Sequence, residues 1–311
     1  MKLIRGLKNI PKQLKNTAVT IGDFDGVHLG HQSVIRKLQL EAAKRKLKTV
    51  LICFEPQPVE FFWKEKAQGR IMRLREKLMA FKKLKLDYVL CLPFNEALAD
   101  LSPEEFVKKI LSDALDCKLL VIGDDFCCGK KRAGNADVLR GLGKKYQFEV
   151  EQLQTFVVEH ARDSSTRIRA ALQKGNFHLV EELLGQPYFL NGKVIHGDAR
   201  GRSLGFPTAN IALQPYHMAL TGIFMVEADG VNDKPLLGVA NIGIRPTFEN
   251  KGFILEIYFL DFDQDIYGKT LTVRFSHKIR DEKKFNALED LKKEMAKDVE
   301  KARAFQKLNK K

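Results

Sequence analysis

Four short apolar runs, separated by longer stretches with helical spacing, constrain the fold of the first half of this chain more than any other feature. The runs lie at 17–22, 49–54, 87–92 and 118–123, and each has the length of a buried strand. Between them, 31–46, 73–85 and 103–114 repeat apolar residues at helical intervals. This alternation predicts βαβ units, and therefore a doubly wound parallel sheet that binds ligands at the carboxyl ends of its strands.

The second half follows a different pattern. Beyond about residue 186, β-rich runs alternate with Gly, Pro, Asn and Asp, and the next long helix is expected at 285–307. These runs favour an antiparallel barrel or sandwich closed by a C-terminal helix. With 311 residues, the chain is long enough for two domains. The boundary is expected near Gly185-Gln186-Pro187, giving domains 1–185 and 186–311.

Charge and cysteine content narrow the class of protein without choosing a function. A net charge of +14 suits nucleic acid, acidic membranes or nucleotide phosphates as partners. No apolar run approaches the ~20 residues that span a bilayer, and charges occupy the start of the chain, so a cytoplasmic protein is expected. Five cysteines, three of them in or beside apolar runs, indicate no disulfide framework. The lysine-rich end, 292–311, is either a binding tail or, more commonly for alternating Lys and Glu, a solvated helix face.

The stretch from Gly22 to Gln32, GDFDGVHLGHQ, follows the first strand and opens the first helix. Its glycines let the backbone approach a ligand, and a helix N-terminus attracts phosphate. His28 and His31 can then stabilise charge that develops on a phosphorus atom. An isolated His-x-Gly-His string is more often structural, and a zinc site is weaker still because no further His or Cys cluster accompanies it.

This stretch resembles the first signature of the bacterial bifunctional riboflavin kinase and FAD synthetase (FMN adenylyltransferase) family. Three further segments match that family in order, namely FEPQP (54–58), GDDFCCGKKRAG (123–134) and SSTRIR (164–169). In the last, Ser165 and Thr166 can cap a helix while Arg167 and Arg169 bind phosphate, although SSTRIR alone equally fits an ordinary capped helix. The resemblance implies catalytic roles for His28 and His31 and ATP-binding roles for Gly22, Phe24, Gly30, Ser165, Thr166, Arg167 and Arg169.

One segment departs from the family pattern. Cys127 and Cys128 stand where the family commonly has an arginine and an aromatic residue. Asp125 and Phe126 persist, so the resemblance implies that they bind flavin. The departure leaves open whether Lys130, Lys131 and Arg132 hold the FMN phosphate instead, and small hydrophobic packing is the favoured role for the two cysteines.

The second half carries GRSLGFPTAN (201–210), which resembles the riboflavin kinase motif. Thr208 and Asn210 are two residues apart on a β-run and share one face, which suits Mg²⁺ bridging ATP phosphates. The resemblance implies that Gly205 and Thr208 bind the nucleotide. Without the family pattern, Pro-Thr-x-Asn fits a turn. Glu256 alternates with Leu255 and Ile257, and the resemblance implies that it is the general base, whereas a surface glutamate is the plain alternative. Arg280 is implied to bind flavin.

The resemblance covers about residues 15–305. It implies an N-terminal Rossmann-like nucleotidyltransferase domain and a C-terminal antiparallel kinase barrel with a C-terminal helix. The implied reactions are phosphorylation of riboflavin to FMN and adenylylation of FMN to FAD, with ATP as co-substrate and Mg²⁺ as cofactor. Partners would be these small molecules, without nucleic acid or membrane, and no oligomeric state is predicted.

Two alternatives remain at this point. One is a tRNA-handling enzyme with a His-x-Gly-His ATP site, and the other is a non-catalytic nucleic-acid-binding module.

Overall fold

A computed structural model describes residues 1–154, 157–158, 161–162, 164–197, 201, 205–213, 217–246 and 251–308. The chain forms two compact units, which we describe separately. The first comprises Met1–Gln68 and Lys77–Ser164, and the second comprises Gly69–Glu76 and Ser165–Lys311. By packing, the helical segment after Ser164 therefore belongs with the second unit. The domain boundary at 185/186, expected from the change in sequence pattern, stays a prediction.

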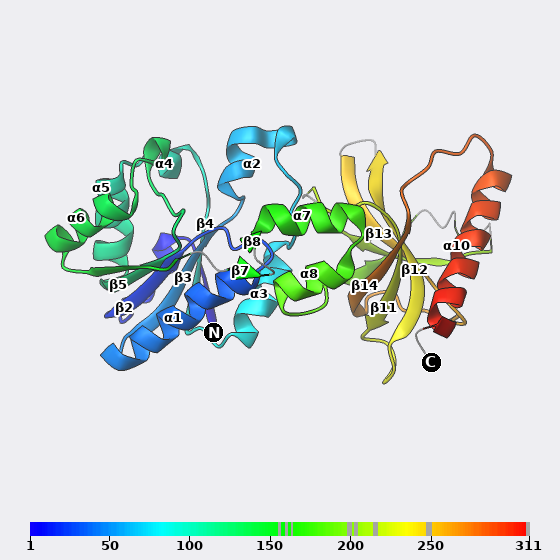
Figure 1. The fold of residues 1–311 in the computed structure, drawn as a ribbon, viewed down its shortest axis with the longest axis horizontal. Helices are drawn as coiled ribbons and strands as arrows, with labels where there is room; N and C mark the ends of the chain where they lie inside the picture. The colour runs from blue at the N-terminus through cyan, green and yellow to red at the C-terminus, as the bar shows by residue number, and fades with distance from the viewer. Residues whose placement is uncertain are drawn as a thin grey trace. The chain divides into compact units, whose positions relative to one another are not determined.

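The first unit is built on a six-stranded parallel sheet in the order β1-β4-β3-β2-β5-β6 (Figure 1). The four apolar runs form its central strands, each within one residue of the predicted bounds, so the predicted parallel sheet is confirmed. The edge strands were not predicted, because they are only four residues long and carry charged or polar side chains. The strands are β1 (Lys2–Arg5), β2 (Thr17–Ile21), β3 (Lys48–Phe54), β4 (Tyr88–Leu92), β5 (Cys117–Ile122) and β6 (Glu149–Gln152), followed by a small pair, β7 (Val157–Val158) and β8 (Ala161–Arg162).

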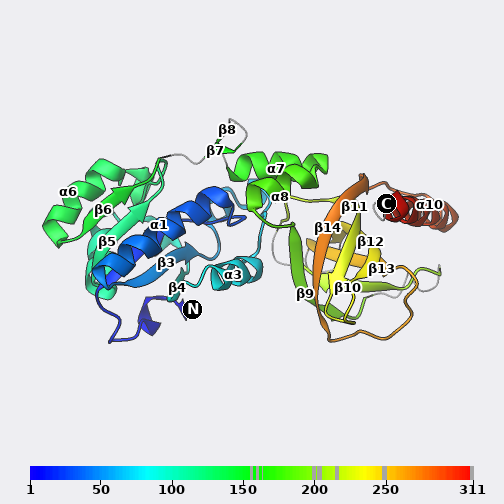
Figure 2. The same ribbon diagram turned by 60° about the horizontal axis from the view of Figure 1, so that its bottom comes forward.

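Helices cover this sheet, which is why its central strands are apolar along their whole length. The helix α1 packs on β2, β3 and β5, and Figure 2 shows it running across these strands. The predicted helix at 103–114 begins with a capping box at Ser102 and then continues as a π-helix, η3. The helical elements are η1 (Leu7–Asn9), α1 (Leu29–Arg45), α2 (Pro58–Trp63), η2 (Lys64–Lys66), α3 (Leu74–Lys83), α4 (Glu96–Ala99), α5 (Pro103–Phe106), η3 (Val107–Ala114), η4 (Lys130–Arg132) and α6 (Ala136–Tyr146).

The strand order reverses between β2 and β5, which are hydrogen-bonded neighbours. From β2 the chain crosses to β3 and then β4 on one side, and from β5 it continues to β6 on the other. In such sheets the loops at the reversal separate and leave a crevice at the carboxyl ends of the strands. The loops after Ile21 and Ile122 both leave the sheet at this position.

The second unit contains a closed six-stranded barrel, ordered β10-β13-β12-β11-β14-β9 and antiparallel throughout. This resolves the choice between barrel and sandwich in favour of the barrel. Helix α10 packs on β12 and β14, as Figure 1 shows. The elements are α7 (Ser165–Lys174), α8 (Phe177–Leu184), β9 (Phe189–Ile195), β10 (Thr208–Ala212), β11 (Gly222–Asp229), β12 (Leu236–Pro246), β13 (Lys251–Phe259), β14 (Thr270–Arg280) and α10 (Leu288–Leu308).

None of the helices in the described part of the chain combines the length and the apolarity needed to cross a bilayer.

Candidate active sites

The loop between β2 and α1 has an unusual backbone. Phe24, Gly26 and Val27 all have positive φ, at 48°, 90° and 45°. Two of them are not glycine, and such conformations are costly and concentrate at functional sites. A Cβ on Gly22 would lie 3.2 Å from the Phe24 ring, and the Gly22 N–H donates to the Ile52 carbonyl at 3.1 Å. The loop is therefore held tightly against the sheet at the strand reversal.

The two predicted histidines lie together at the start of α1. Their rings stack with centroids 3.7 Å apart, and the Phe24 ring meets His31 edge-on at 5.1 Å. His28 is the N-cap residue and is buried, and Nδ1 of His31 is buried with no hydrogen-bond partner among the described residues. Withdrawal from water, with smaller effects of His28 and Lys77, lowers the pKa of His31 well below its ordinary value. His31 is thus neutral at pH 7 in this structure, and it would offer an oriented N–H rather than a cation.

Lys77 is a site residue that the sequence did not reveal. It is fully buried, and its ammonium group donates to the carbonyl of Asp23 at 2.9 Å. This contact places a cation beneath the β2–α1 loop. A lysine on an amphipathic helix ordinarily faces solvent, so no pattern in the sequence separated Lys77 from its neighbours.

The second loop at the strand reversal runs from Gly123 to Gly134. Cys128 is buried in the core cluster, and burial raises the pKa of its thiol to about 12, so it packs as a small hydrophobe. Phe126 packs against the same core, while Asp125 is exposed and its carbonyl accepts from Arg132 at 3.3 Å. Lys130 is ion-paired with Asp100 at 2.8 Å. Of the three basic residues considered for the FMN phosphate, Lys130 therefore already has a carboxylate partner.

An aromatic cluster at the ends of β3 and β4 was also not predicted. Phe61, Phe62 and Phe94 meet pairwise with ring centroids 5.2 to 5.7 Å apart, and Phe54 meets Phe94 at 5.6 Å. Phe62 and the neighbouring Trp63 are more than half exposed. The sequence signal was available in FEPQPVEFFW, where three aromatic residues follow the FEPQP segment.

The second unit holds a cavity of about 400 Å³. Glu256 lies in its wall at the centre of one rung, because its register partners are Asn210 on β10 and Asn241 on β12. Leu255 and Ile257 are fully buried, so Glu256 faces the opposite side, as its alternation with them predicted. The cavity is lined by Gly201, Phe206, Thr208, Ile223, Val239, Asn241, Glu256, Tyr258, Arg280, Glu282, Lys283, Phe285, Leu291, Met295, Asp298 and Val299.

Thr208 and Asn210 share the face of β10 that carries this rung. Asn210 is 4% exposed, its Nδ2 donates to the Thr208 carbonyl at 3.3 Å, and its buried Oδ1 has no partner in the described structure. A buried, unpaired amide oxygen beside a threonine hydroxyl is a donor set that Mg²⁺ accepts when phosphate oxygens complete the shell. Across the described ranges, no cluster of three His, Cys, Asp or Glu side chains offers an alternative metal site.

Gly201 and Gly205 frame this motif. The Gly201 carbonyl accepts from the Phe206 N–H at 2.8 Å, and a Cβ on Gly201 would lie 2.4 Å from the Phe206 carbonyl. Gly205 has φ 86°, a conformation that favours glycine. Arg202, Ser203 and Leu204 of the motif lie outside the described residues.

Arg280, for which the resemblance implied flavin binding, also lines the cavity and is fixed by α10. Asp298 accepts from Nε at 3.0 Å and from Nη2 at 2.7 Å, and the Arg280 guanidinium lies 5.9 Å from the centroid of the Phe285 ring. Asp298 is 2% exposed. Sequence analysis missed it, because alternating Lys, Glu and Asp at 292–311 resembled a solvated helix face.

The four predicted phosphate-binding residues of SSTRIR open helix α7. The helix begins at Ser165, so Ser165 and Thr166 lie in its first turn and Ser164 occupies the cap position. Nε of Arg169 donates to the Gly69 carbonyl at 2.8 Å within the second unit. His28 and His31 lie in the first unit, so a common role of both groups at one nucleotide stays a prediction.

Taken together, the two units define a two-site transferase class: a Rossmann-like unit with a strained loop at its strand reversal, and a barrel unit with a carboxylate-bearing cavity. Residues 10–167 match the family model of FAD synthetase, and residues 184–306 match that of riboflavin kinase. The chain belongs to the family of bifunctional riboflavin kinase/FMN adenylyltransferases. This membership supports the flavin interpretation over a tRNA-handling enzyme.

Relatives match along nearly the whole chain. The bifunctional riboflavin kinase/FMN adenylyltransferase of Haemophilus influenzae is 44% identical over 305 residues, covering 98% of this chain and 99% of the relative. That of Escherichia coli K12 is 43% identical over 306 residues, covering 98% of each. A solved structure described as a macrolide-efflux protein from Streptococcus pneumoniae is 30% identical, with a TM-score of 0.78 over 97% of this chain and 99% of that one.

Proposed function

We propose that the second unit phosphorylates riboflavin with ATP to give FMN and ADP, and that the first half of the chain adenylylates FMN with ATP to give FAD and pyrophosphate. The observation that carries the kinase assignment is the rung in which Glu256 lies between Asn210 and Asn241 at the cavity. It places a carboxylate next to the proposed metal ligands, as phosphoryl transfer to an alcohol requires.

In the kinase step, Glu256 accepts the proton of the ribityl 5′-hydroxyl as the hydroxyl oxygen attacks the γ-phosphorus of ATP, and ADP leaves. Thr208 and Asn210 would hold Mg²⁺, which when bound neutralises charge on the phosphate oxygens. Gly205 lets the backbone approach the nucleotide, and Arg280 directs N–H groups at the flavin. No covalent enzyme intermediate is needed, because positioning and charge neutralisation suffice.

In the adenylyl step, a phosphate oxygen of FMN attacks the α-phosphorus of ATP and pyrophosphate leaves. His28 and His31, at the N-terminus of α1, would donate hydrogen bonds to the α-phosphate as its negative charge grows. That negative charge would itself raise the pKa of His31 towards its ordinary value. Gly22, Phe24 and Gly30 shape the cradle, and Ser165, Thr166, Arg167 and Arg169 would bind the outer phosphates.

On the flavin side of this reaction, Asp125 and Phe126 are the proposed contacts. The exposed Phe62 and Trp63 add flat apolar surface at the same edge of the sheet, and such surface suits stacking with an aromatic ring system. We place the enzyme in the cytoplasm, where ATP is supplied and where five free cysteines stay reduced.

One pair of variants tests this division of labour. Glu256→Gln should abolish FMN formation from riboflavin yet spare conversion of supplied FMN to FAD, and His31→Ala should do the reverse. The measurement is chromatographic separation of the flavins after incubation with ATP, with and without Mg²⁺. Equal loss of both reactions in either variant contradicts the assignment of one reaction to each site.

A further inference from the structure

The charge of the cavity in the second unit differs in sign from that of the chain. The sequence carries a net +14, whereas the charged side chains that line the cavity are three carboxylates and two cations. The carboxylates are Glu256, Glu282 and Asp298, and the cations are Arg280 and Lys283. The described lining of this cavity therefore does not attract an anion, although the rest of the protein is basic.

Asp298 is the central element of this arrangement. Its carboxylate, almost fully buried on α10, binds Arg280 through Nε and Nη2, and Nη1 of Arg280 donates to the Asp281 carbonyl at 3.0 Å. A two-point carboxylate contact fixes the plane of a guanidinium group and offsets its charge. Arg280 is thus presented to the cavity in one orientation, with its charge already compensated.

A second carboxylate of α10 extends the network. Glu294 lies 3.6 Å from Nε of Arg280 and 2.8 Å from Nζ of Lys283. Lys283 is the main cause of a lowered pKa for Glu294, which is therefore ionised at neutral pH. Each of the two cations in the described lining consequently has a carboxylate partner, so neither presents an uncompensated charge to a ligand.

The substrate and the product of the proposed kinase reaction differ mainly in charge. Riboflavin is uncharged, whereas a phosphate monoester carries close to two negative charges at neutral pH. A cavity whose cations are neutralised distinguishes riboflavin from its phosphate monoester, because it binds the charged phosphate group less favourably. We propose that Asp298 is a positioning residue which holds Arg280 fixed and charge-compensated, so that the cavity prefers riboflavin to FMN and releases its product. This inference rests on the proposed kinase function.

The variant Asp298→Asn tests it, because it keeps the shape of the side chain and removes the two-point carboxylate partner of Arg280, which leaves only Glu294 at 3.6 Å from Nε. The inhibition constant of FMN against the kinase reaction should fall about fivefold relative to the KM of riboflavin. ADP formation is the readout, since adenylylation yields pyrophosphate and only the kinase reaction yields ADP. A purely structural role would weaken both flavins alike and leave the ratio of the two constants unchanged.

The chain provides a control in an exposed ion pair that also involves α10. Asp261 accepts from Nη1 and Nη2 of Arg303 at 2.9 and 2.7 Å, which is also a two-point pair between α10 and the barrel, but neither residue lines the cavity. Asp261→Asn should leave the FMN-to-riboflavin ratio as in the unmodified protein. Adding Arg280→Gln to Asp298→Asn removes the uncompensated charge and should return the ratio towards its original value.

Circular dichroism shows whether Asp298→Asn folds. If it does not, Arg280→Gln alone still tests the inference. It makes the lining more acidic, so FMN should inhibit more weakly relative to the KM of riboflavin. A ratio that is unchanged in both the Asp298→Asn and the Arg280→Gln chains overturns the inference. Absence of ADP formation from riboflavin in the unmodified enzyme would instead overturn the proposed function, so the two failures are distinguishable.

Discussion

Asn210 shows how far a single residue can be assigned from sequence and where packing must complete the assignment. The spacing of Thr208 and Asn210 predicted a shared face, and the strand β10 has that geometry. The spacing could not show that Oδ1 of Asn210 is buried and unpaired within the described structure. A buried, unpaired oxygen costs free energy unless a ligand donates a hydrogen bond to it or coordinates it.

Replacing Asn210 with Asp therefore has a defined consequence for the metal. The variant keeps the size of the side chain and adds a negative charge next to Glu256, its register partner. The added charge attracts Mg²⁺, so the Mg²⁺ concentration at half-maximal kinase rate should fall in Asn210→Asp, whereas Asn210→Ala, which removes the oxygen, should raise it by about tenfold or more. Kinase rates over a Mg²⁺ titration provide the measurement. An unchanged Mg²⁺ requirement in Asn210→Ala would remove this residue from the metal site.

The charged residues of the candidate sites that the sequence did not reveal share one physical property. Lys77 and Asp298 are charged yet buried, and each lies on a helix that also carries exposed charged residues, such as Arg75 on α3 and Lys292 on α10. Periodicity assigns a charged residue to the solvent side by default. It therefore cannot identify a charged side chain that is buried because it binds a partner in another element. Glu256 escaped this limit because a family motif, rather than its periodicity, indicated its role.

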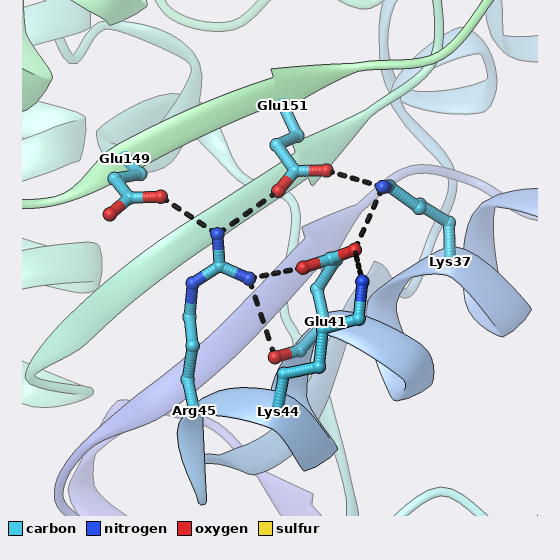
Figure 3. A network of polar contacts seen from close by, with 6 residues as sticks. All are labelled: Lys37, Glu41, Lys44, Arg45, Glu149 and Glu151. Atoms are coloured by element: carbon cyan, nitrogen blue, oxygen red, sulfur yellow. Dashed lines mark hydrogen bonds and ion pairs between the residues drawn. The ribbon is translucent and has the colours of Figure 1, made fainter.

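Helix α1 presents His28 and His31 at its N-terminal end, and polar contacts join its C-terminal end to the sheet. Glu41 binds Lys37, Lys44 and Arg45, and Arg45 reaches across to Glu149 and Glu151 on β6 (Figure 3). Lys37 also contacts Glu151 at 2.9 Å. The network joins α1 to the edge strand β6 and thereby helps to hold the helix in place on the sheet.

The pKa of Glu41 makes this network testable. Its hydrogen bonds with Lys44, Lys37 and Arg45 lower the pKa of Glu41 from 4.5 to about 2. A carboxyl group with a lowered pKa stabilises the fold fully above its unfolded-state pKa, and the contribution is lost as the pH falls from 4.5 towards 2. Glu41→Gln should therefore lower the Tm at pH 7, and the difference from the unmodified protein should shrink over that acid range.

Glu149→Gln is the matched control for this experiment. Glu149 is an exposed member of the same network, with a side chain 67% exposed and one contact to Arg45 at 2.9 Å. An exposed ion pair contributes little, so this variant should change the Tm only slightly. Calorimetric scans from pH 2 to pH 7 would measure both. Equal effects of the two variants would show that Glu41 is not the centre of the network.

Elements were predicted well where burial is uniform and poorly where it is not. The central strands β2, β3, β4 and β5 are covered on both faces, so their sequences are continuous apolar runs that stand out from their surroundings. The edge strand β6, Glu149–Gln152, is half charged because its side chains meet Arg45 and solvent, and its sequence resembles a loop. The barrel was left as one of two choices because closure depends on pairing between β10, β13 and β9, which no local pattern encodes.

At the scale of the whole molecule, the question is whether one chain must carry both sites. The proposed kinase residues Thr208, Asn210 and Glu256 all belong to the second unit, and His28 and His31 belong to the first. The charge-compensated lining around Arg280 and Asp298 favours release of FMN from the cavity. FMN that leaves can be adenylylated by any chain with an intact first site.

A mixture of two variants, each of which lacks one of the two reactions, tests this directly. Neither Glu256→Gln nor His31→Ala should make FAD from riboflavin alone, but together they should do so, because FMN made by the His31→Ala chain diffuses to the Glu256→Gln chain. FAD should appear after a lag in which FMN accumulates, and raising the concentration of the Glu256→Gln chain should shorten the lag. An added apoprotein that traps free FMN should suppress FAD formation in the mixture. If no FAD forms in the mixture although the Glu256→Gln chain converts supplied FMN, the His31→Ala chain does not release its FMN, and release of FMN into solution would not be part of the route to FAD.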